Sequence, residues 1–188
     1  MPNTLLLEMW SHCDYDKVLY DSEVDGKDGA VFRNKILRHD HLYFIVIDSN
    51  CNVFGHYHPS SLKEGSNYDD KVFMFSLRNC EGEGPRKFKP KTNGICTTIY
   101  RGNRENYQFY SSGYIVNKID GYCVNTLNPA DGVMTNISNV YANVRCSDFL
   151  VIKQFKKIRF MPQRLVVIQM QERRAKSDVD QINPIIID

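Results

Sequence analysis

Apolar positions in this chain fall into short runs separated by turn-forming residues. Residues 42–47 and 72–77 are apolar on both faces, as expected of strands that are covered on two sides. Asp, Ser and Asn dominate residues 48–52, and residues 53–58 have strand composition, so this stretch predicts a hairpin. The other predicted strands are residues 18–20, 95–100, 150–155 and 165–170.

Helical patterning is limited to two segments. Asp28-Gly29 is predicted to start a helix that runs to Arg38, because Phe32 and Ile36 share one face. A second helix is predicted over residues 171–179, with little apolar stripe and therefore on the surface. The predicted loops are residues 63–70, 79–93 and 125–139.

These elements together predict one α+β domain over residues 1–170. The strands are expected to form two packed antiparallel sheets, a β-sandwich flanked by a few helices. Residues 171–188 are predicted to be a C-terminal tail, helical or partly ordered, that ends in the apolar residues 184–187.

Composition agrees with a globular chain that stays out of membranes. The 188 residues are 42% hydrophobic and 24% charged, enough to form a core without disulfides or metal. No apolar run is long enough to cross a bilayer, and the first residues lack the features of a secretory signal. The six cysteines form no C-x-x-C pair, so reduced thiols and an intracellular location are expected.

Charge is unevenly distributed. Residues 1–70 carry a net charge of −6, whereas residues 150–176 hold eight basic residues and one acid, a net charge of +7. Such a segment predicts contact with nucleic acid or with an acidic partner, unless its charges are merely solvated on several faces. The candidate contact residues are Lys153, Lys156, Lys157, Arg159, Arg164, Arg173, Arg174 and Lys176.

Sites for catalysis or metal binding are weakly indicated. Residues 21–26 begin like an EF-hand calcium loop, but Phe32 stands where that loop needs Glu. His56 and His58 share one strand face, a geometry that suits zinc, but no third ligand lies nearby in the sequence. No nucleophile elbow, zincin, Walker or dinucleotide-binding motif occurs. We therefore expect no catalytic residue, no metal and no cofactor; a thiol- or metal-dependent enzyme acting on peroxide is an alternative.

The order of several motifs resembles the TLDc domain family. Val18-Leu19-Tyr20-Asp21-Ser22 resembles its opening strand and polar turn, and residues 26–37 its first helix. Residues 42–48 with Asn52-Val53-Phe54-Gly55 resemble its hairpin, and residues 71–77 its "F-x-F" strand. With residues 150–160 similar to the closing strand, the resemblance covers roughly residues 8–170.

The second half departs from the family pattern. The glycine-rich segment is reduced to Ser111-Ser112-Gly113, and Lys156 and Ile158 stand where the closing strand usually has an acid and an aromatic residue. His56 replaces a small residue after Phe54-Gly55. The aromatic residues and glycine of the first half are better explained by core packing and close backbone approach than by chemistry.

The resemblance implies a two-sheet α+β sandwich. The family is associated with resistance to oxidative stress and with binding the peripheral sector of the vacuolar proton pump. We therefore expect a non-catalytic interaction domain, in cytoplasm or nucleus, whose partner is a protein such as a peripheral pump subunit. The alternative is a stress-responsive, DNA-binding transcription regulator that uses the basic residues of 153–176. The oligomeric state is left open.

Overall fold

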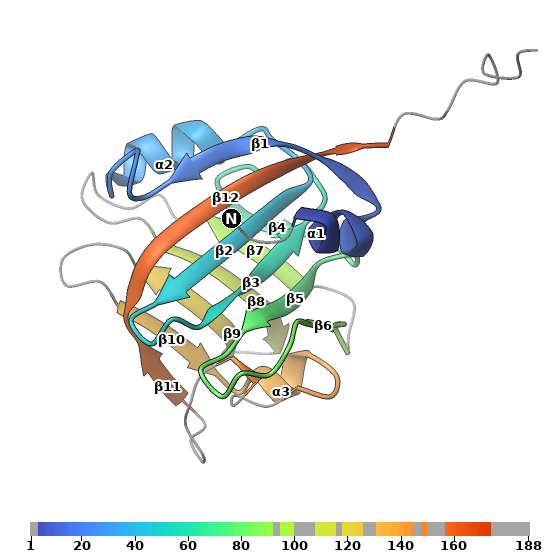
Figure 1. The fold of residues 1–188 in the computed structure, drawn as a ribbon, viewed down its shortest axis with the longest axis vertical. Helices are drawn as coiled ribbons and strands as arrows, with labels where there is room; N and C mark the ends of the chain where they lie inside the picture. The colour runs from blue at the N-terminus through green and yellow to red at the C-terminus, as the bar shows by residue number, and fades with distance from the viewer. Residues whose placement is uncertain are drawn as a thin grey trace, which may run out of the picture.

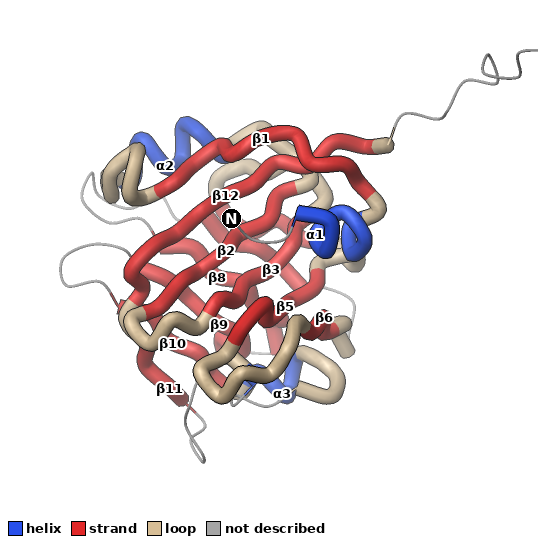
Figure 2. The backbone as a smooth tube through the Cα atoms, viewed as in Figure 1, coloured by secondary structure: helices blue, strands red, loops and turns tan. Residues whose placement is uncertain are grey.

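The structure, a computed structural model, describes residues 4–91, 95–99, 108–115, 118–125, 131–144, 148–149 and 157–173. In this part of the chain the strands form two antiparallel sheets of six strands each (Figures 1 and 2). Sheet A contains, in spatial order, β1 (Cys13–Asp21), β12 (Pro162–Glu172), β2 (Leu42–Asp48), β3 (Val53–His58), β5 (Phe73–Arg78) and β6 (Arg86–Phe88). Sheet B contains β11 (Lys157–Phe160), β10 (Asp131–Thr135), β9 (Lys118–Asn125), β8 (Gln108–Ile115), β7 (Ile95–Ile99) and β4 (Gly65–Tyr68).

Helices are short in the described residues. They are α1 (Thr4–Ser11), α2 (Gly29–Ile36) and α3 (Ile137–Val140). The described residues are mostly antiparallel sheet with a few short helices, which is consistent with the expected fold class. No helix among the described residues is long and apolar enough to span a membrane.

β2 is covered on both faces, as its apolar sequence predicts. Phe44 and Val46 belong to a large buried cluster that includes residues of sheet B, such as Tyr122 and Val124 of β9. The alternate residues of β2, among them Ile45, belong to a second cluster on the other face of sheet A. Successive side chains of a strand point to opposite faces, so one strand contributes to both cores.

Aromatic side chains link the two sheets inside the large cluster. Phe54 of β3 meets the ring of Tyr122 at a centroid distance of 5.8 Å and that of Phe160 in β11 at 5.1 Å, both edge to face. Such pairs stabilise a core beyond the area that they bury. The predicted packing role of Phe73 and Phe75 is also confirmed, since both are buried in the second cluster.

Helix α1, which the sequence did not predict, covers the outer face of sheet A (Figure 1). Its Leu7 is fully buried, and the hydroxyl of Tyr43 donates a hydrogen bond to the Leu7 carbonyl at 2.8 Å. Trp10 packs against Phe75 with ring centroids 5.9 Å apart. The helix has no acidic residue in its first turn, and its apolar residues do not all face the core: Leu5 is 67% exposed.

The predicted hairpin and first helix are confirmed. β2 and β3 pair antiparallel across the turn at residues 48–52, and α2 follows Asp28, whose carboxylate accepts bonds from the Ala30 and Val31 amides. The helix ends at Ile36, two residues before the predicted end. Strands β5, β7 and β12 overlap the strands predicted there, and residues 150–155 lie outside the described part.

Four predictions of non-strand structure are wrong at least in part. Each of the three predicted loops contains a strand, namely β4, β6 and β10. The predicted start of the helix over residues 171–179 is wrong. Gln171 and Glu172 are instead the last residues of β12, where they pair with Asp14 and Cys13 of β1. Residues 174–179 lie outside the described part.

Gly55 permits the close approach of β2 and β3. An added Cβ at this position would lie 1.7 Å from the Phe44 carbonyl oxygen. We expect Gly55→Ala to lower the free energy of unfolding by about 3 kcal/mol or more, because the two strands must move apart. Urea unfolding measures the loss. Gly84→Ala is the matched control, because an added Cβ there has no heavy atom within 4 Å; equal midpoints for the two variants would contradict the role of Gly55.

Candidate functional site

Four strand ends meet at one end of sheet A. Antiparallel pairing places Cys13, the first residue of β1, directly opposite Glu172, the last residue of β12. In the same way Leu42, the first residue of β2, lies opposite His58 of β3 and Gln169 of β12. Residues far apart in the sequence are therefore neighbours at this end of the sheet.

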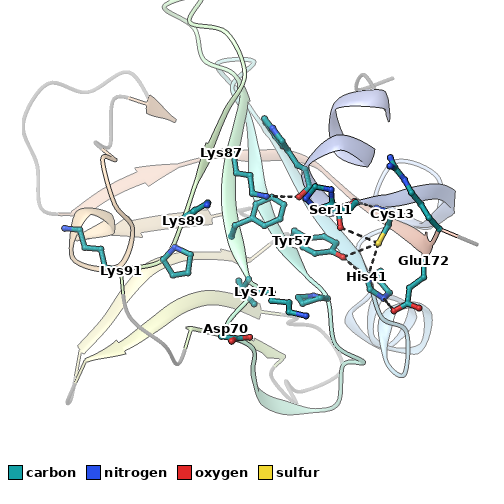
Figure 3. A pocket seen from close by; sticks show the side chains of 17 residues that line it. Ser11, Cys13, His41, Tyr57, Asp70, Lys71, Lys87, Lys89, Lys91 and Glu172 are labelled. Atoms are coloured by element: carbon teal, nitrogen blue, oxygen red, sulfur yellow. Dashed lines mark hydrogen bonds and ion pairs between the residues drawn. The ribbon is translucent and has the colours of Figure 1, made fainter. Parts of the chain in front are cut away.

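A cleft of about 730 Å³ opens at these strand ends (Figure 3). Aromatic side chains line it, namely Trp10, Tyr57 and Phe73. Four lysines also line the cleft, namely Lys71, Lys87, Lys89 and Lys91. Its size and its mixture of aromatic and charged groups are those of a ligand-binding cleft.

A thiol, an imidazole, a phenol and a carboxylate lie side by side in this cleft (Figure 3). The Nδ1 atom of His41 lies 3.5 Å from the Cys13 sulfur and 2.7 Å from the Tyr57 hydroxyl. The other ring nitrogen, Nε2, lies 3.6 Å from a carboxylate oxygen of Glu172. Burial raises the pKa of Tyr57, so its hydroxyl stays protonated and donates to Nδ1. Nδ1 is then the acceptor and Nε2 carries the proton that faces Glu172.

The backbone around these groups is held in an uncommon conformation. His12, next to Cys13, has a φ of 59° and His41 a φ of 52°, both in the left-handed region. The His41 carbonyl accepts a bond from the Met170 amide at 2.9 Å, and the His41 amide donates to the Pro59 carbonyl at 2.9 Å. Strained backbone that neighbouring elements hold in place is found preferentially at functional sites.

The lysines of the cleft have different environments. Burial, and then the charge of Lys89, lower the pKa of Lys87, whose ammonium donates to the Trp10 carbonyl at 2.7 Å and sits 3.9 Å from the Phe73 ring centre. Lys91 donates to the Ser138 carbonyl at 2.6 Å. Lys71 and Lys89 are exposed and form no ion pair with an acid in the described part of the chain. They leave positive charge available to a ligand.

The basic residues expected to form one contact surface are dispersed where the structure describes them. Arg159 lies in β11 of sheet B, whereas Arg164 lies near the start of β12 in sheet A and Arg173 just beyond its end. Nine residue steps separate the last two, up to about 30 Å along an extended strand. Lys157 belongs to β11, and Lys153, Lys156, Arg174 and Lys176 lie outside the described residues.

Each of these three arginines is paired with an acid. Arg164 binds both carboxylate oxygens of Asp21, and this contact lowers the pKa of Asp21. Arg173 lies 3.2 Å from Asp14, and Arg159 lies 3.5 Å from Asp131. Arg164 is therefore a structural residue of the turn after β1, and Arg173 is the only one of the three that lines the cleft.

The two histidines of β3 are core residues. His56 is fully buried and stacked on Phe44, and its ring nitrogens bond to the hydroxyls of Tyr122 and Thr97 in sheet B. A neutral imidazole satisfies both contacts, and burial lowers the pKa of His56. His58 is also buried, and neither of its ring nitrogens has a hydrogen-bond partner among the described residues.

Metal-binding groupings are absent from the described residues, which contain no set of three or more His, Cys, Asp or Glu that could hold an ion. In the cleft, Cys13 and Glu172 contact opposite nitrogens of the His41 ring, so they do not converge on one point. In the acidic turn after β1, the Asp25 carboxylate is used by the ammonium of Lys35 and the Asp21 amide.

Cys13, His41, Tyr57 and Glu172 form what we call the thiol–imidazole cluster. Sequence patterns alone did not bring these four residues together. The sequence predicts reduced cysteines without distinguishing Cys13, and the helix that it predicts over residues 171–179 includes Glu172. A search for alternating apolar and polar positions over residues 13–21 and 162–172 could have extended the two predicted strands to Cys13 and Glu172. Nothing local indicates that His41 and Tyr57 meet them.

Comparisons with known proteins assign neither a family nor a function to this chain. No family model matches the chain, and no curated protein matches it significantly. The site is therefore interpreted from its own geometry.

Arg164 should matter for stability, whereas Arg159 should not. We expect Arg164→Gln to lower the free energy of unfolding by about 1–2 kcal/mol, because it leaves the largely buried carboxylate of Asp21 without its bidentate partner. Arg159→Gln is the matched control and should cost less than about 0.5 kcal/mol, because that pair is exposed. Urea unfolding of both variants measures the difference, and equal losses would contradict it.

His58 should make the fold sensitive to acid. Burial lowers its pKa to about 4 against the opposing effect of Asp69, whereas an unfolded histidine titrates near 6.5. Between these values the unfolded state binds the proton and the folded state does not, so stability falls as the pH falls. Between pH 7 and pH 4, we expect the free energy of unfolding of wild type to fall by about 3 kcal/mol more than that of His58→Phe. Parallel stability–pH curves for the two proteins would show that His58 is not responsible.

Proposed function

We propose that this chain is a TLDc-type interaction domain that binds an acidic segment of a protein partner in the cleft at the strand ends of sheet A. The observation that carries the proposal is a pair of exposed lysines beside an aromatic surface, Lys71 and Lys89, which form no ion pair with any acid that the structure describes. Aromatic anchors with complementary charge around them are typical of protein-binding surfaces.

The family part of this proposal rests on the TLDc resemblance. The motifs that carry it lie on β1, α2, β2, β3 and β5. The two sheets contribute side chains to one buried cluster, which agrees with the two-sheet sandwich that the resemblance implies. We therefore include the sandwich, and the association of that family with stress resistance and the vacuolar proton pump, in the proposal.

The nucleic-acid alternative has less support from the described residues. Phosphate binding needs cations that can neutralise the backbone together. Arg159, Arg164 and Arg173 each face a carboxylate, and they lie on two different sheets or at opposite ends of one strand. We therefore place the binding surface at the cleft and propose a protein as the partner.

Binding to purified peripheral subunits of the vacuolar proton pump tests this function. We expect the double variant Lys71→Glu, Lys89→Glu to weaken the complex by about tenfold or more, because two favourable charge contacts become repulsive. Wild-type affinity should also fall as salt rises. Titration calorimetry measures both effects.

The matched control makes the same change of charge away from the cleft. Lys27 and Lys63 are exposed and do not line the cleft, so Lys27→Glu, Lys63→Glu should leave affinity nearly unchanged. Equal losses in the two double variants would contradict the cleft as the binding surface. Failure to bind any subunit at low salt, together with salt-sensitive binding of duplex DNA, would favour the nucleic-acid alternative.

A further inference from the structure

The thiol–imidazole cluster of the cleft has no part in the function proposed above. We propose that Cys13 is a covalent modification site that exchanges with a small carboxylate-bearing disulfide and keeps the attached thiol in the cleft as a mixed disulfide. The inference does not depend on a protein partner, since it rests on the contacts of Cys13 and on the charge of the surrounding cleft.

His41 is placed to activate the thiol. Its Nδ1 lies 3.5 Å from the Cys13 sulfur but accepts from the Tyr57 hydroxyl at 2.7 Å, so it takes the thiol proton when that hydroxyl turns toward the sulfur, 3.8 Å away. The carboxylate of Glu172 lies 3.6 Å from Nε2 on the opposite side of the ring, where it stabilises the imidazolium that forms. Nucleophile, base and carboxylate therefore follow one another in the order that activates a weak nucleophile.

The exchange step balances without any other reactant. The Cys13 thiolate attacks one sulfur of the incoming disulfide and forms a new S–S bond with it. The original S–S bond of the reagent breaks, and its second sulfur leaves as a thiolate that takes the proton from the His41 imidazolium. One thiol and one disulfide are present before and after, so there is no net oxidation.

The same groups suit acyl transfer less well. Acyl transfer requires donors aimed at a developing oxyanion. The Cys13 amide is already directed to the Ser11 hydroxyl oxygen at 3.3 Å, and the Tyr57 hydroxyl to Nδ1 at 2.7 Å. Disulfide exchange keeps the charge on sulfur and needs no such donors, which is why we assign that chemistry.

The cleft determines which disulfide is favoured. Lys71 and Lys89 provide positive charge in the cleft that Cys13 also lines, and the volume of about 730 Å³ accommodates a molecule of peptide size. Carboxylates on the reagent would be attracted to these two ammonium groups. Figure 3 shows the cluster at one side of the view and Lys91 at the other, with Lys71, Lys87 and Lys89 between them.

Access to the sulfur is narrow. Cys13 is only 4% exposed, and it is one of the residues that line the cleft. The Glu172 side chain beside the His41 ring is 84% exposed and free to move aside. We therefore expect small, flexible reagents to reach the sulfur. In contrast, Cys51 and Cys80 are exposed, and they serve as reference thiols in the same chain.

Oxidised glutathione on the full chain tests the site. The rate of mixed-disulfide formation is measured for each cysteine at pH 7 by quenching and peptide mass spectrometry. We expect Cys13 to react about tenfold faster than Cys51 and Cys80 despite its burial, because Cys13 is the one of these three thiols with an imidazole beside it among the described residues. A rate at Cys13 equal to or below that of the exposed thiols would overturn the proposal.

Variants of the neighbouring residues separate base catalysis from simple exposure. His41→Asn tolerates the left-handed backbone and removes the base, so the Cys13 rate should fall about tenfold. Tyr57→Phe frees Nδ1 for the thiol proton and should raise the rate. Glu172→Gln, at an exposed position, should lower it. If His41→Asn does not fold, base catalysis is tested by the other two variants, because it predicts a higher Cys13 rate for Tyr57→Phe and a lower one for Glu172→Gln.

The charge of the reagent provides the second test. Cystamine is a disulfide with ammonium groups in place of carboxylates, and it should react more slowly than oxidised glutathione at Cys13 but not at Cys51. Lys71→Gln, Lys89→Gln should remove this preference and leave the cystamine rate unchanged or higher. Equal rates of the two disulfides at Cys13 of wild type would overturn the assignment. It would also be overturned if hydrogen peroxide oxidises Cys13 but neither disulfide forms a mixed disulfide with it.

Discussion

The double burial of β2 is the constraint on which the rest of the molecule depends. Phe44 and Val46 pack toward sheet B, while Tyr43 and Ile45 pack toward α1. A shift of one residue in its pairing would exchange these two sets of side chains between cores of different shape. The pairing of β2 with β12 and β3 is therefore strongly specified, and the positions of the residues at their ends follow from it.

The cleft is a consequence of this register. His41 immediately precedes β2, and Tyr57 lies opposite Tyr43 in the pairing of β2 with β3. β12 then carries Glu172 to the position opposite Cys13. The four groups of the cluster thus lie on or beside strands that are fixed by two cores, which holds their geometry better than a loop would.

Local patterns predicted the parts of the fold that local residues determine. The apolar run of β2, the polar turn after it and the Asp28 start of α2 are short-range signals, and all three are confirmed. β4, with the sequence Gly-Ser-Asn-Tyr, has the composition of a loop and is a strand only because it pairs with β7. α1 has no acidic residue in its first turn, and its position depends on the outer face of sheet A. The cluster combines positions 13, 41, 57 and 172, so it could be found only once the pairing of four strands was known.

The geometry of the cluster carries an energetic cost that the second core offsets. Two histidines in the left-handed region cost roughly 1 kcal/mol each relative to ordinary backbone. Burial of Leu7 and Phe75 beneath α1 contributes roughly 2 kcal/mol for each side chain. Ser11 connects the second core to the cluster, because its hydroxyl donates to the Leu7 carbonyl and accepts from the Cys13 amide. The packing of α1 on sheet A therefore places the thiol beside His41, and the part of the fold that sequence patterns missed is the part that positions the candidate nucleophile.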